Sequence, residues 1–266
     1  MTLSTAFLSG HQLAYAVDHI DILQGIDIAI HHGEMVGLIG PNGVGKSTLL
    51  KLLLGALPPT HGQVSLQGRA LLEHPAETRA RQIGYLAQGA RAAWPMTVQR
   101  LVELGRLPHQ GFWQRTQEQD RHAVTAAMAL AEVTAYQHRI ATTLSGGEQT
   151  LAMLARVFAG EPTLLLADEP VAALDPYHQL HVMELLRSHA NGTGCCFVVL
   201  HDLNLAARFC DRLYLFQHGT VVAQGTPEAV LTEDKLHAVY GIEALIDHIG
   251  SGIRITPTRR IRNGHP

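Results

Sequence analysis

The sequence predicts an α/β fold with a helical insertion. Short apolar runs alternate with helical patterns in the first and last parts of the 266-residue chain, which is typical of strands buried in a largely parallel sheet. Between about Gly89 and Gly160 the β-branched runs thin out, and apolar residues recur at helical spacing. We therefore expect one domain over residues 1–266, with an α/β core (1–88 and 161–241), a helical insert (89–160) and a C-terminal extension (242–266).

The first strands and helix lie on either side of a glycine-rich stretch. Ile26–Ile30 alternates apolar and polar residues, as a half-buried strand does, and Met35–Ile39 is an apolar run of the kind that forms a buried strand. Leu49–Leu54 contains strong helix formers and ends at a glycine. Gln63–Gly68 follows a proline breaker and predicts an edge strand.

The helical insert and the second half of the core continue this pattern. The elements that we expect are helices over 97–104, 120–131 and 146–158, then the strand 163–167, the helix 177–189, the strand 195–200, the helix 203–209 and a hairpin over 213–223. The C-terminal extension carries four arginines within residues 254–262, which we expect at a solvated edge.

The composition predicts a globular, cytosolic protein. With 46% hydrophobic and 16% charged residues the chain is not disordered, and a net charge of −3 gives no sign of a nucleic-acid partner. No apolar run approaches the roughly 20 residues of a membrane span, and the first residues lack the layout of a signal peptide. Three cysteines form no disulfide framework or zinc spacing. The 17 histidines, His178 and His181 among them, are scattered, and we interpret them as ordinary polar residues.

A phosphate-binding pattern follows the strand Met35–Ile39. Gly40-Pro41-Asn42-Gly43-Val44-Gly45-Lys46-Ser47-Thr48 matches G-x-x-x-x-G-K-[ST]. A strand, a glycine loop and a helix start together direct backbone N–H groups and the positive end of a helix dipole at an anion. Lys46 can reach the β- and γ-phosphates of a nucleotide, and the Ser47 hydroxyl can bind Mg²⁺. A chance match is disfavoured because both flanking elements stand where the loop requires them.

Two carboxylates close a later apolar strand. Asp168 and Glu169 directly follow Thr163–Ala167. In a protein with a phosphate loop, such a strand places an aspartate near Mg²⁺. We therefore expect Asp168 to bind the metal and Glu169 to act as the general base that polarises the attacking water. The alternative is a solvated acidic turn.

A second glycine-bearing helix start lies in the insert, at Leu144-Ser145-Gly146-Gly147-Glu148. Ser145 as N-cap and Glu148 at N3 match a capping box. Capping does not ask for two glycines in the first turn, where each costs up to about 1 kcal/mol relative to alanine. Bare backbone at a helix start suits a second anion site, and both interpretations are kept. Because this site lies on another subdomain, we expect the two phosphate sites to meet across a dimer.

The order of these motifs resembles the nucleotide-binding subunit of ABC transporters. The motifs are the phosphate loop, Gln88 at a strand end, Leu144–Glu148, Asp168-Glu169, Ala173-Leu174-Asp175 and the strand-terminal His201. The resemblance covers nearly the whole chain. It implies a single ABC-type ATPase domain that binds ATP and Mg²⁺, with a P-loop ATPase core, an antiparallel β subdomain and an inserted helical subdomain.

The resemblance also implies roles for individual residues. Two chains would stack head to tail, with each ATP between Gly40–Thr48 of one chain and Ser145–Gly147 of the other. Gln88 would link Mg²⁺ and the γ-phosphate to the membrane partner. His201 would hold the γ-phosphate, and Asp175 would couple the two sites.

Tyr15 and the segment Trp94–Leu107 each allow two interpretations. Tyr15 resembles the aromatic residue that stacks on adenine, and a core tyrosine is the alternative. The segment Trp94–Leu107 is apolar enough to line a groove for a short partner helix. It suits the core of the insert equally well.

Further strings are similar to the ATPase subunits of bacterial importers for iron-siderophore complexes, haem and vitamin B12. They are Leu104–His109, Asp175–Gln179, Leu200–Ala207 and Gln224–Glu228. Such systems imply an ATPase homodimer held by integral membrane permease subunits at the cytoplasmic face of the inner membrane. A periplasmic substrate-binding protein is then an indirect partner. The alternatives are another ABC importer or exporter class, or a soluble ABC-type ATPase acting on nucleic acid or the ribosome. The last is disfavoured by the single cassette and the lack of a heptad run.

Overall fold

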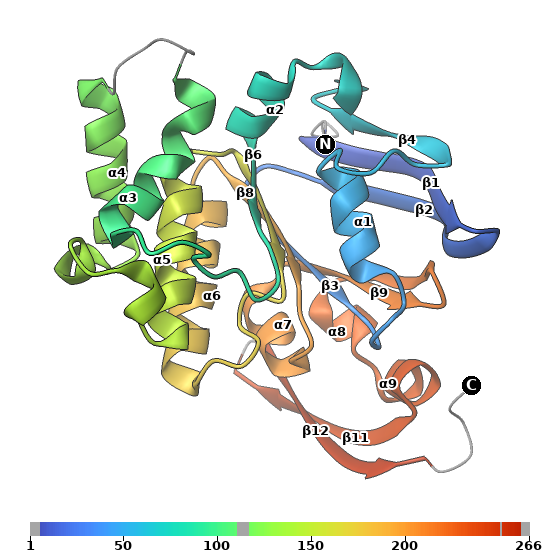
Figure 1. Ribbon diagram of the computed structural model, residues 1–266. Coiled ribbons are helices and arrows are strands. Elements are labelled where there is room, and N and C mark those ends of the chain that lie inside the picture. Colours follow the sequence, from blue (N-terminus) through green and yellow to red (C-terminus); the bar gives the residue numbers. More distant parts are fainter. Residues whose placement is uncertain (1–5, 111–116, 251, 262–266) are drawn as a thin grey trace. The chain divides into compact units, whose positions relative to one another are not determined.

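The computed structural model describes residues 6–110, 117–250 and 252–261 and divides into two compact units (Figure 1). One unit contains residues 1–71 and 197–266, and the other contains residues 72–196. The boundary falls within strand β8 (Cys195–Val199). Each unit combines strands with helices, which confirms the α/β fold class. Among the described residues, no helix has both the length and the apolar character that crossing a bilayer requires.

The first unit contains a four-stranded antiparallel sheet. Its strand order is β2-β1-β4-β5, with bounds β1 (Leu8–Val17), β2 (Ile20–Ile30), β4 (His61–Leu66) and β5 (Arg69–Ala70). The expected edge strand corresponds to β4, but β4 pairs with both β1 and β5 and therefore lies inside the sheet rather than at its edge. It also begins and ends two residues earlier than predicted. The reason is that Gln67 and Gly68 take left-handed backbone conformations, with φ of 51° and 79°, and turn the chain towards β5.

A second group of strands in this unit contains the predicted buried strand. β3 (Met35–Ile39) has the bounds that the sequence predicts, and all five of its residues are buried. It pairs in parallel with β9 (Arg212–Gln217), which pairs antiparallel with β10 (Thr220–Gly225). The hydroxyl of Tyr214 on β9 accepts a hydrogen bond of 3.1 Å from the backbone N–H of Ala29 on β2. This contact joins the two groups of strands.

The helices of the first unit are α1 (Lys46–Leu53), α7 (Leu203–Phe209), α8 (Pro227–Val230) and α9 (Glu233–Tyr240). A C-terminal hairpin of β11 (Ile242–Ile249) and β12 (Gly252–Arg260) packs against α7. The Asn204 side chain donates to the backbone oxygen of Ile255 at 3.1 Å and accepts from its N–H at 2.8 Å. The arginines expected at a solvated edge are exposed on β12 at positions 254, 259 and 260, and Arg262 lies outside the described residues.

The second unit contains a parallel strand pair and most of the helices. β6 (Ile83–Leu86) pairs in parallel with β7 (Leu164–Asp168), and every residue of β7 and β8 is buried. Such unbroken apolar strands are typical of a parallel sheet that is covered on both faces. The helices are η1 (Leu71–Glu73, at the boundary), α2 (Ala76–Gln82), α3 (Val98–Glu103), η2 (Leu104–His109), α4 (Glu118–Leu130), η3 (Thr134–Tyr136), η4 (Ala141–Thr143), α5 (Gly146–Ala159) and α6 (Pro176–Asn191).

Helices α3, α4 and α5 pack on one another and form the core of the helical segment. Val98 and Leu101 of α3 are buried there, whereas Trp94 and Leu107 are exposed. The middle of the segment Trp94–Leu107 therefore belongs to the core, as one interpretation predicts. Its two ends face solvent, as a groove for a partner helix requires.

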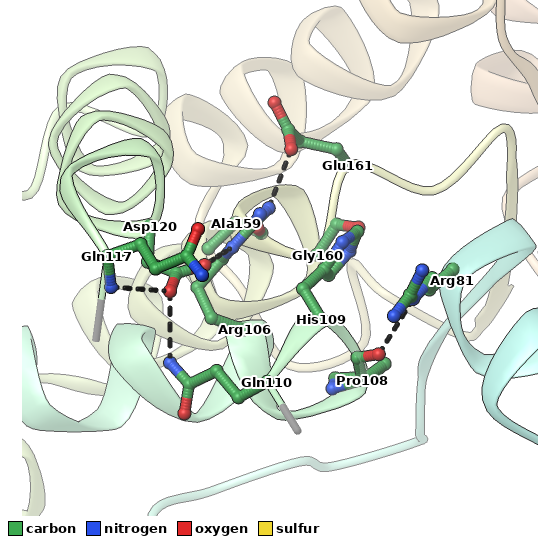
Figure 2. Close-up of polar contacts among 10 residues, drawn as sticks. All are labelled: Arg81, Arg106, Pro108, His109, Gln110, Gln117, Asp120, Ala159, Gly160 and Glu161. Carbon is green, nitrogen blue, oxygen red and sulfur yellow. Dashed lines mark hydrogen bonds and ion pairs between the residues drawn. The ribbon is translucent and has the colours of Figure 1, made fainter. Parts of the chain in front are cut away.

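A buried arginine joins three of these elements (Figure 2). Arg106 of η2 is 2% exposed. Its Nε donates to Oδ1 of Asp120 on α4 at 2.9 Å, and its Nη1 donates to the backbone oxygen of Ala159 at 2.8 Å and to Oε2 of Glu161 at 2.6 Å. The guanidinium therefore links the start of α4 to the C-terminal end of α5.

Candidate functional site

The glycine loop connects β3 to α1, as the sequence predicts. Gly40, Gly43 and Gly45 have φ of 149°, 77° and 98°. Residues other than glycine rarely adopt these backbone conformations. A Cβ at Gly40 would lie 2.4 Å from the backbone oxygen of Phe216, because the loop packs directly on β9. Gly45 is the N-cap of α1, and the first turn of this helix contains no acidic residue. The N-terminus of α1 thus keeps the positive electrostatic character that favours an anion.

Lys46 is the buried cation of the loop, with 6% of its surface exposed. Its ammonium group donates to the backbone oxygens of Gly40 and Pro41, each at 2.7 Å. These bonds span the loop and hold the charge next to its backbone. Ser47 and Thr48 follow in the first turn and are half-buried.

A cavity of ≈ 570 Å³ lies beside the loop in the first unit. Its lining comes from β2, the loop, the turn between β9 and β10 and the end of α9: residues 20–22, 24, 41–44, 217–219, 238, 239 and 241. This volume is in the range of ligand pockets. Tyr15 lies on β1 opposite Leu23 and is not part of the lining that the described residues give this cavity.

His201 lies two residues beyond the end of β8, in the same unit as the glycine loop. The N–H of the preceding residue, Leu200, donates to the oxygen of Leu38 on β3 at 3.1 Å. The His201 side chain is exposed. The next residue, Asp202, caps α7 by accepting from the N–H of Asn204 at 2.8 Å. His201 therefore stands at the sheet edge from which the glycine loop leaves β3.

The two carboxylates and Gln88 meet at one edge of the strand pair β6–β7. Asp168 is buried at the end of β7. Burial, assisted by the charge of Asp168, raises the pKa of Tyr85 on β6. Glu169 has a φ of 50°, an uncommon conformation outside glycine that is often found at functional sites. The Nε2 of Gln88 donates to Oε2 of Glu169 at 2.6 Å. The structure thus brings together the predicted base and one predicted metal ligand.

The start of α5 contains the predicted capping box. Ser145 Oγ accepts from the Glu148 N–H at 3.4 Å, and Glu148 Oε2 accepts from the Ser145 N–H at 2.7 Å. These bonds with Ser145 hold the pKa of Glu148 below its ordinary value. Among the described residues, a Cβ on Gly146 would meet no atom within 4 Å, whereas one on Gly147 would lie 2.5 Å from the His178 ring. The capping interpretation is confirmed, and Gly146 presents bare backbone beside it.

Asp175 is the N-cap of α6 and is held by His178, which we interpreted from the sequence as an ordinary polar residue. Its Oδ1 accepts from the backbone N–H of His178 at 3.1 Å, and its Oδ2 contacts the ring Nδ1 of His178 at 2.7 Å. Hydrogen bonds from His178 hold the pKa of Asp175 below its ordinary value. The only available signal is the spacing, because a histidine three residues after a helix N-cap can bond back to it.

The predicted site residues fall into two sets, one in each unit. The first unit holds Tyr15, Gly40–Thr48 and His201, and the second holds Gln88, Ser145–Gly147, Asp168, Glu169 and Asp175. The predicted metal ligands Ser47, Gln88 and Asp168 offer a hydroxyl, an amide and a carboxylate oxygen. Such a donor set fits Mg²⁺, which prefers oxygen ligands.

Comparison with known proteins gives a consistent result. The family model described as ABC transporter matches residues 23–172. The hemin import ATP-binding protein HmuV of Pseudomonas entomophila is 44% identical over 231 residues, which cover 85% of this chain and 89% of that protein. The ferric enterobactin transport ATP-binding protein FepC of Escherichia coli is 38% identical over 247 residues, which cover 92% of this chain and 91% of that protein.

Two solved structures are similar over most of the chain. One belongs to a transporter assigned to the metal-chelate ABC type, in an inward-facing conformation. It has a TM-score of 0.84 and 25% identity, with 97% of this chain and 98% of that chain covered. The other is a dimer of the ATP-binding cassette MJ0796 in a post-hydrolysis state with ADP and Pi. It has a TM-score of 0.72 and 27% identity, with 83% of this chain and 98% of that chain covered.

Proposed function

Because this chain belongs to the ABC transporter family, we propose that it is the ATP-hydrolysing subunit that powers import of an iron-siderophore, haem or cobalamin type substrate through a separate membrane permease. The observation that carries the proposal is the glycine loop, in which Lys46 is buried against Gly40 and Pro41 at the start of α1. Identity of 44% and 38% to ATP-binding proteins of hemin and ferric enterobactin import supports the substrate class.

In this proposal the first unit binds the phosphates of ATP. Backbone N–H groups within Gly40–Thr48, Pro41 excepted, bind phosphate oxygens at the N-terminus of α1, and Lys46 neutralises the β- and γ-phosphates. His201 contacts the γ-phosphate, and Tyr15 stacks on adenine. Ser47 supplies a hydroxyl ligand to Mg²⁺, which when bound neutralises charge on the phosphates.

The second unit supplies the groups that act on the attacking water. Glu169 is the general base, and its hydrogen bond to Gln88 orients the carboxylate. Asp168 and Gln88 complete the oxygen ligands of the metal. The φ of 50° at Glu169 supports this assignment, since strained backbone is tolerated where it places a functional side chain.

We propose further that two copies bind ATP between them. Ser145–Gly147 of one copy contact the phosphates held by Gly40–Thr48 of the other, and Asp175 couples the two sites. The open space around the exposed Gly146 supports this role, because among the described residues no atom would lie within 4 Å of a Cβ built there. The dimer is held at the cytoplasmic face of the inner membrane by permease subunits. The exposed Trp94 and Leu107 are suited to contact such a partner, and a periplasmic binding protein delivers the substrate to the permease.

The variant Glu169→Gln tests the ATPase assignment. It preserves the size of the side chain and its hydrogen bond to Gln88 but removes the base. We expect ATP binding without turnover, with a loss of about 10²–10⁴-fold in kcat and accumulation of an ATP-bound dimer in size-exclusion chromatography. Glu184→Gln on the exposed face of α6 makes the same chemical change away from the site and is the control. Turnover of Glu169→Gln equal to that of the control removes Glu169 as the base.

Purification of the chain from its own cells distinguishes the class of partner. We expect an integral membrane protein to co-purify after mild detergent extraction. Recovery with ribosomes or nucleic acid contradicts the transport function. Uptake of haem, a ferric siderophore and cobalamin by cells that carry Glu169→Gln then identifies the substrate, because only the cognate uptake is lost.

A further inference from the structure

His178 connects two segments of the second unit that the proposed function uses separately. It is the third residue of α6, where its backbone N–H is bound by Asp175 Oδ1. That bond alone satisfies the helix N-cap. The second bond, between the ring Nδ1 and Asp175 Oδ2 at 2.7 Å, is therefore additional to capping. It fixes the direction of the carboxylate rather than the start of the helix.

The other side of the His178 ring lies against the start of α5. A Cβ on Gly147 would be 2.5 Å from both Cγ and Cδ2 of the ring and 2.7 Å from Nε2. The ring does not turn away freely, because Asp175 holds Nδ1 and the Tyr177 ring packs edge-on at 5.4 Å. The side chain of His178 is 22% exposed, compared with 58% for Asp175. The imidazole of His178 thus contacts both the exposed carboxylate of Asp175 and the glycine turn at Gly147.

We propose that His178 is a positioning residue that holds Asp175 and the Ser145–Gly147 helix start in one fixed arrangement for contact with the second copy. The inference rests on the proposed function, in which both segments act on the partner. If the arrangement is fixed in the free chain, no conformational entropy is lost there on dimer formation. Loss of the connector then weakens the ATP-bound dimer, while ATP binding by Gly40–Thr48 of one chain is unchanged.

Three substitutions separate this role from simple packing. His178→Ala removes both contacts. His178→Phe keeps a ring beside Gly147 but has no donor for Asp175. His178→Asn has no ring, yet its Cγ and two δ atoms occupy the places of those in histidine, so it can donate to Asp175 and contact Gly147 at once. Positioning predicts that Asn restores function and Phe does not, whereas packing predicts the reverse.

The experiment uses the full chain in the Glu169→Gln background, with Mg-ATP as the ligand. The dissociation constant of the dimer is measured by analytical ultracentrifugation, and ATP binding by the monomer by calorimetry. The two copies each lose the contact, so we expect His178→Ala and His178→Phe to raise the dimer dissociation constant about tenfold, and His178→Asn to stay within about threefold of the parent. ATP affinity of the monomer and the melting temperature of the Asn and Phe variants should match the parent.

The outcomes distinguish the two levels of the argument. If the parent Glu169→Gln chain forms no ATP-dependent dimer, the proposed function itself fails. If the parent dimerises and the Ala and Phe variants dimerise equally tightly, the positioning role is overturned alone. A Phe variant that dimerises more tightly than Asn also overturns it, because packing then explains the contact.

Discussion

Replacing the buried Arg106 by methionine tests whether this side chain holds the helical segment together (Figure 2). Methionine keeps an unbranched apolar stem but removes the guanidinium. The change leaves the Asp120 carboxylate, 5% exposed, without its ion pair and removes the donors of Ala159 and Glu161. Breaking a buried ion pair by removing one partner ordinarily costs about 3–5 kcal/mol. Asp120 keeps a bond of 3.1 Å from the Gln117 N–H, so we expect about 3 kcal/mol, the lower end of that range.

The loss should depend on pH in a defined direction. Burial raises the pKa of Asp120, but bonds from Arg106 and from the Gln117 N–H outweigh it, so the pKa lies below its ordinary value. The ionised carboxylate therefore stabilises the native chain above the unfolded pKa, and this contribution is lost as pH falls through the folded pKa. Without Arg106 burial dominates and the folded pKa rises above the unfolded one. The variant should then be penalised most near neutral pH, and the difference from wild type should shrink as pH falls.

The free energy of unfolding is measured by urea titration with circular dichroism, at about pH 7 and about pH 5. Arg100→Met is the matched control, because Arg100 pairs with Glu103 on the surface of α3 with 68% of its side chain exposed. We expect it to cost less than about 1 kcal/mol. The double variant Arg106→Met/Asp120→Asn removes the buried charge and should recover part of the loss. A single variant as stable as the control, or a loss of equal size at both pH values, refutes the reasoning.

Two further predictions concern the glycine loop and the approach of η2 to α5. Lys46→Ala should lose most ATP affinity because the buried ammonium is removed, whereas Lys51→Ala, exposed on the same helix, should not; unchanged calorimetric ATP binding in Lys46→Ala contradicts its role. Gly105→Ala should lower the free energy of unfolding by about 1–3 kcal/mol, since its Cβ would lie 2.0 Å from the Arg156 backbone oxygen. Gly252→Ala is its control, because the new Cβ would meet no atom within 4 Å in the part of the chain that the structure describes. Equal stability of the two variants in urea titration is the contrary result.

Local patterns predicted the parts of the fold whose causes are local. β3 has the predicted bounds because its apolar run is limited by Glu34 on one side and by the glycine loop on the other. The capping box of Ser145 and Glu148 was predictable because both partners lie within one helical turn. The same holds for Asp168, the last residue of β7, and for Glu169, the next residue, because their position at a strand end follows from the apolar run before them.

Contacts between distant residues were not predictable in this way. Arg106 and Glu161 are 55 residues apart. No rule of sequence spacing predicts a contact between an arginine in a short helix and a carboxylate that far along the chain. The hairpin β11–β12 was expected only as a solvated extension, because its alternation rests on few buried residues such as Ile253 and Ile255. Its anchor, Asn204, lies 51 residues earlier in the chain. Helix α2 has no buried residue and therefore shows no apolar periodicity.

Helix α5 is held at both ends by contacts within the second unit. At its start Gly147 contacts His178, and at its end Ala159 accepts from Arg106. Gly147 and Ala159 are 12 residues apart in this helix, so at about 1.5 Å per residue these contacts are about 18 Å apart. At that separation the losses in unfolding free energy from Arg106→Met and His178→Ala should add. In the ATP-bound dimer only His178→Ala should raise the dissociation constant, since Arg106 contacts the end of α5 opposite to the glycine turn. A double variant that dimerises more weakly than His178→Ala alone would contradict this separation of the two ends of α5.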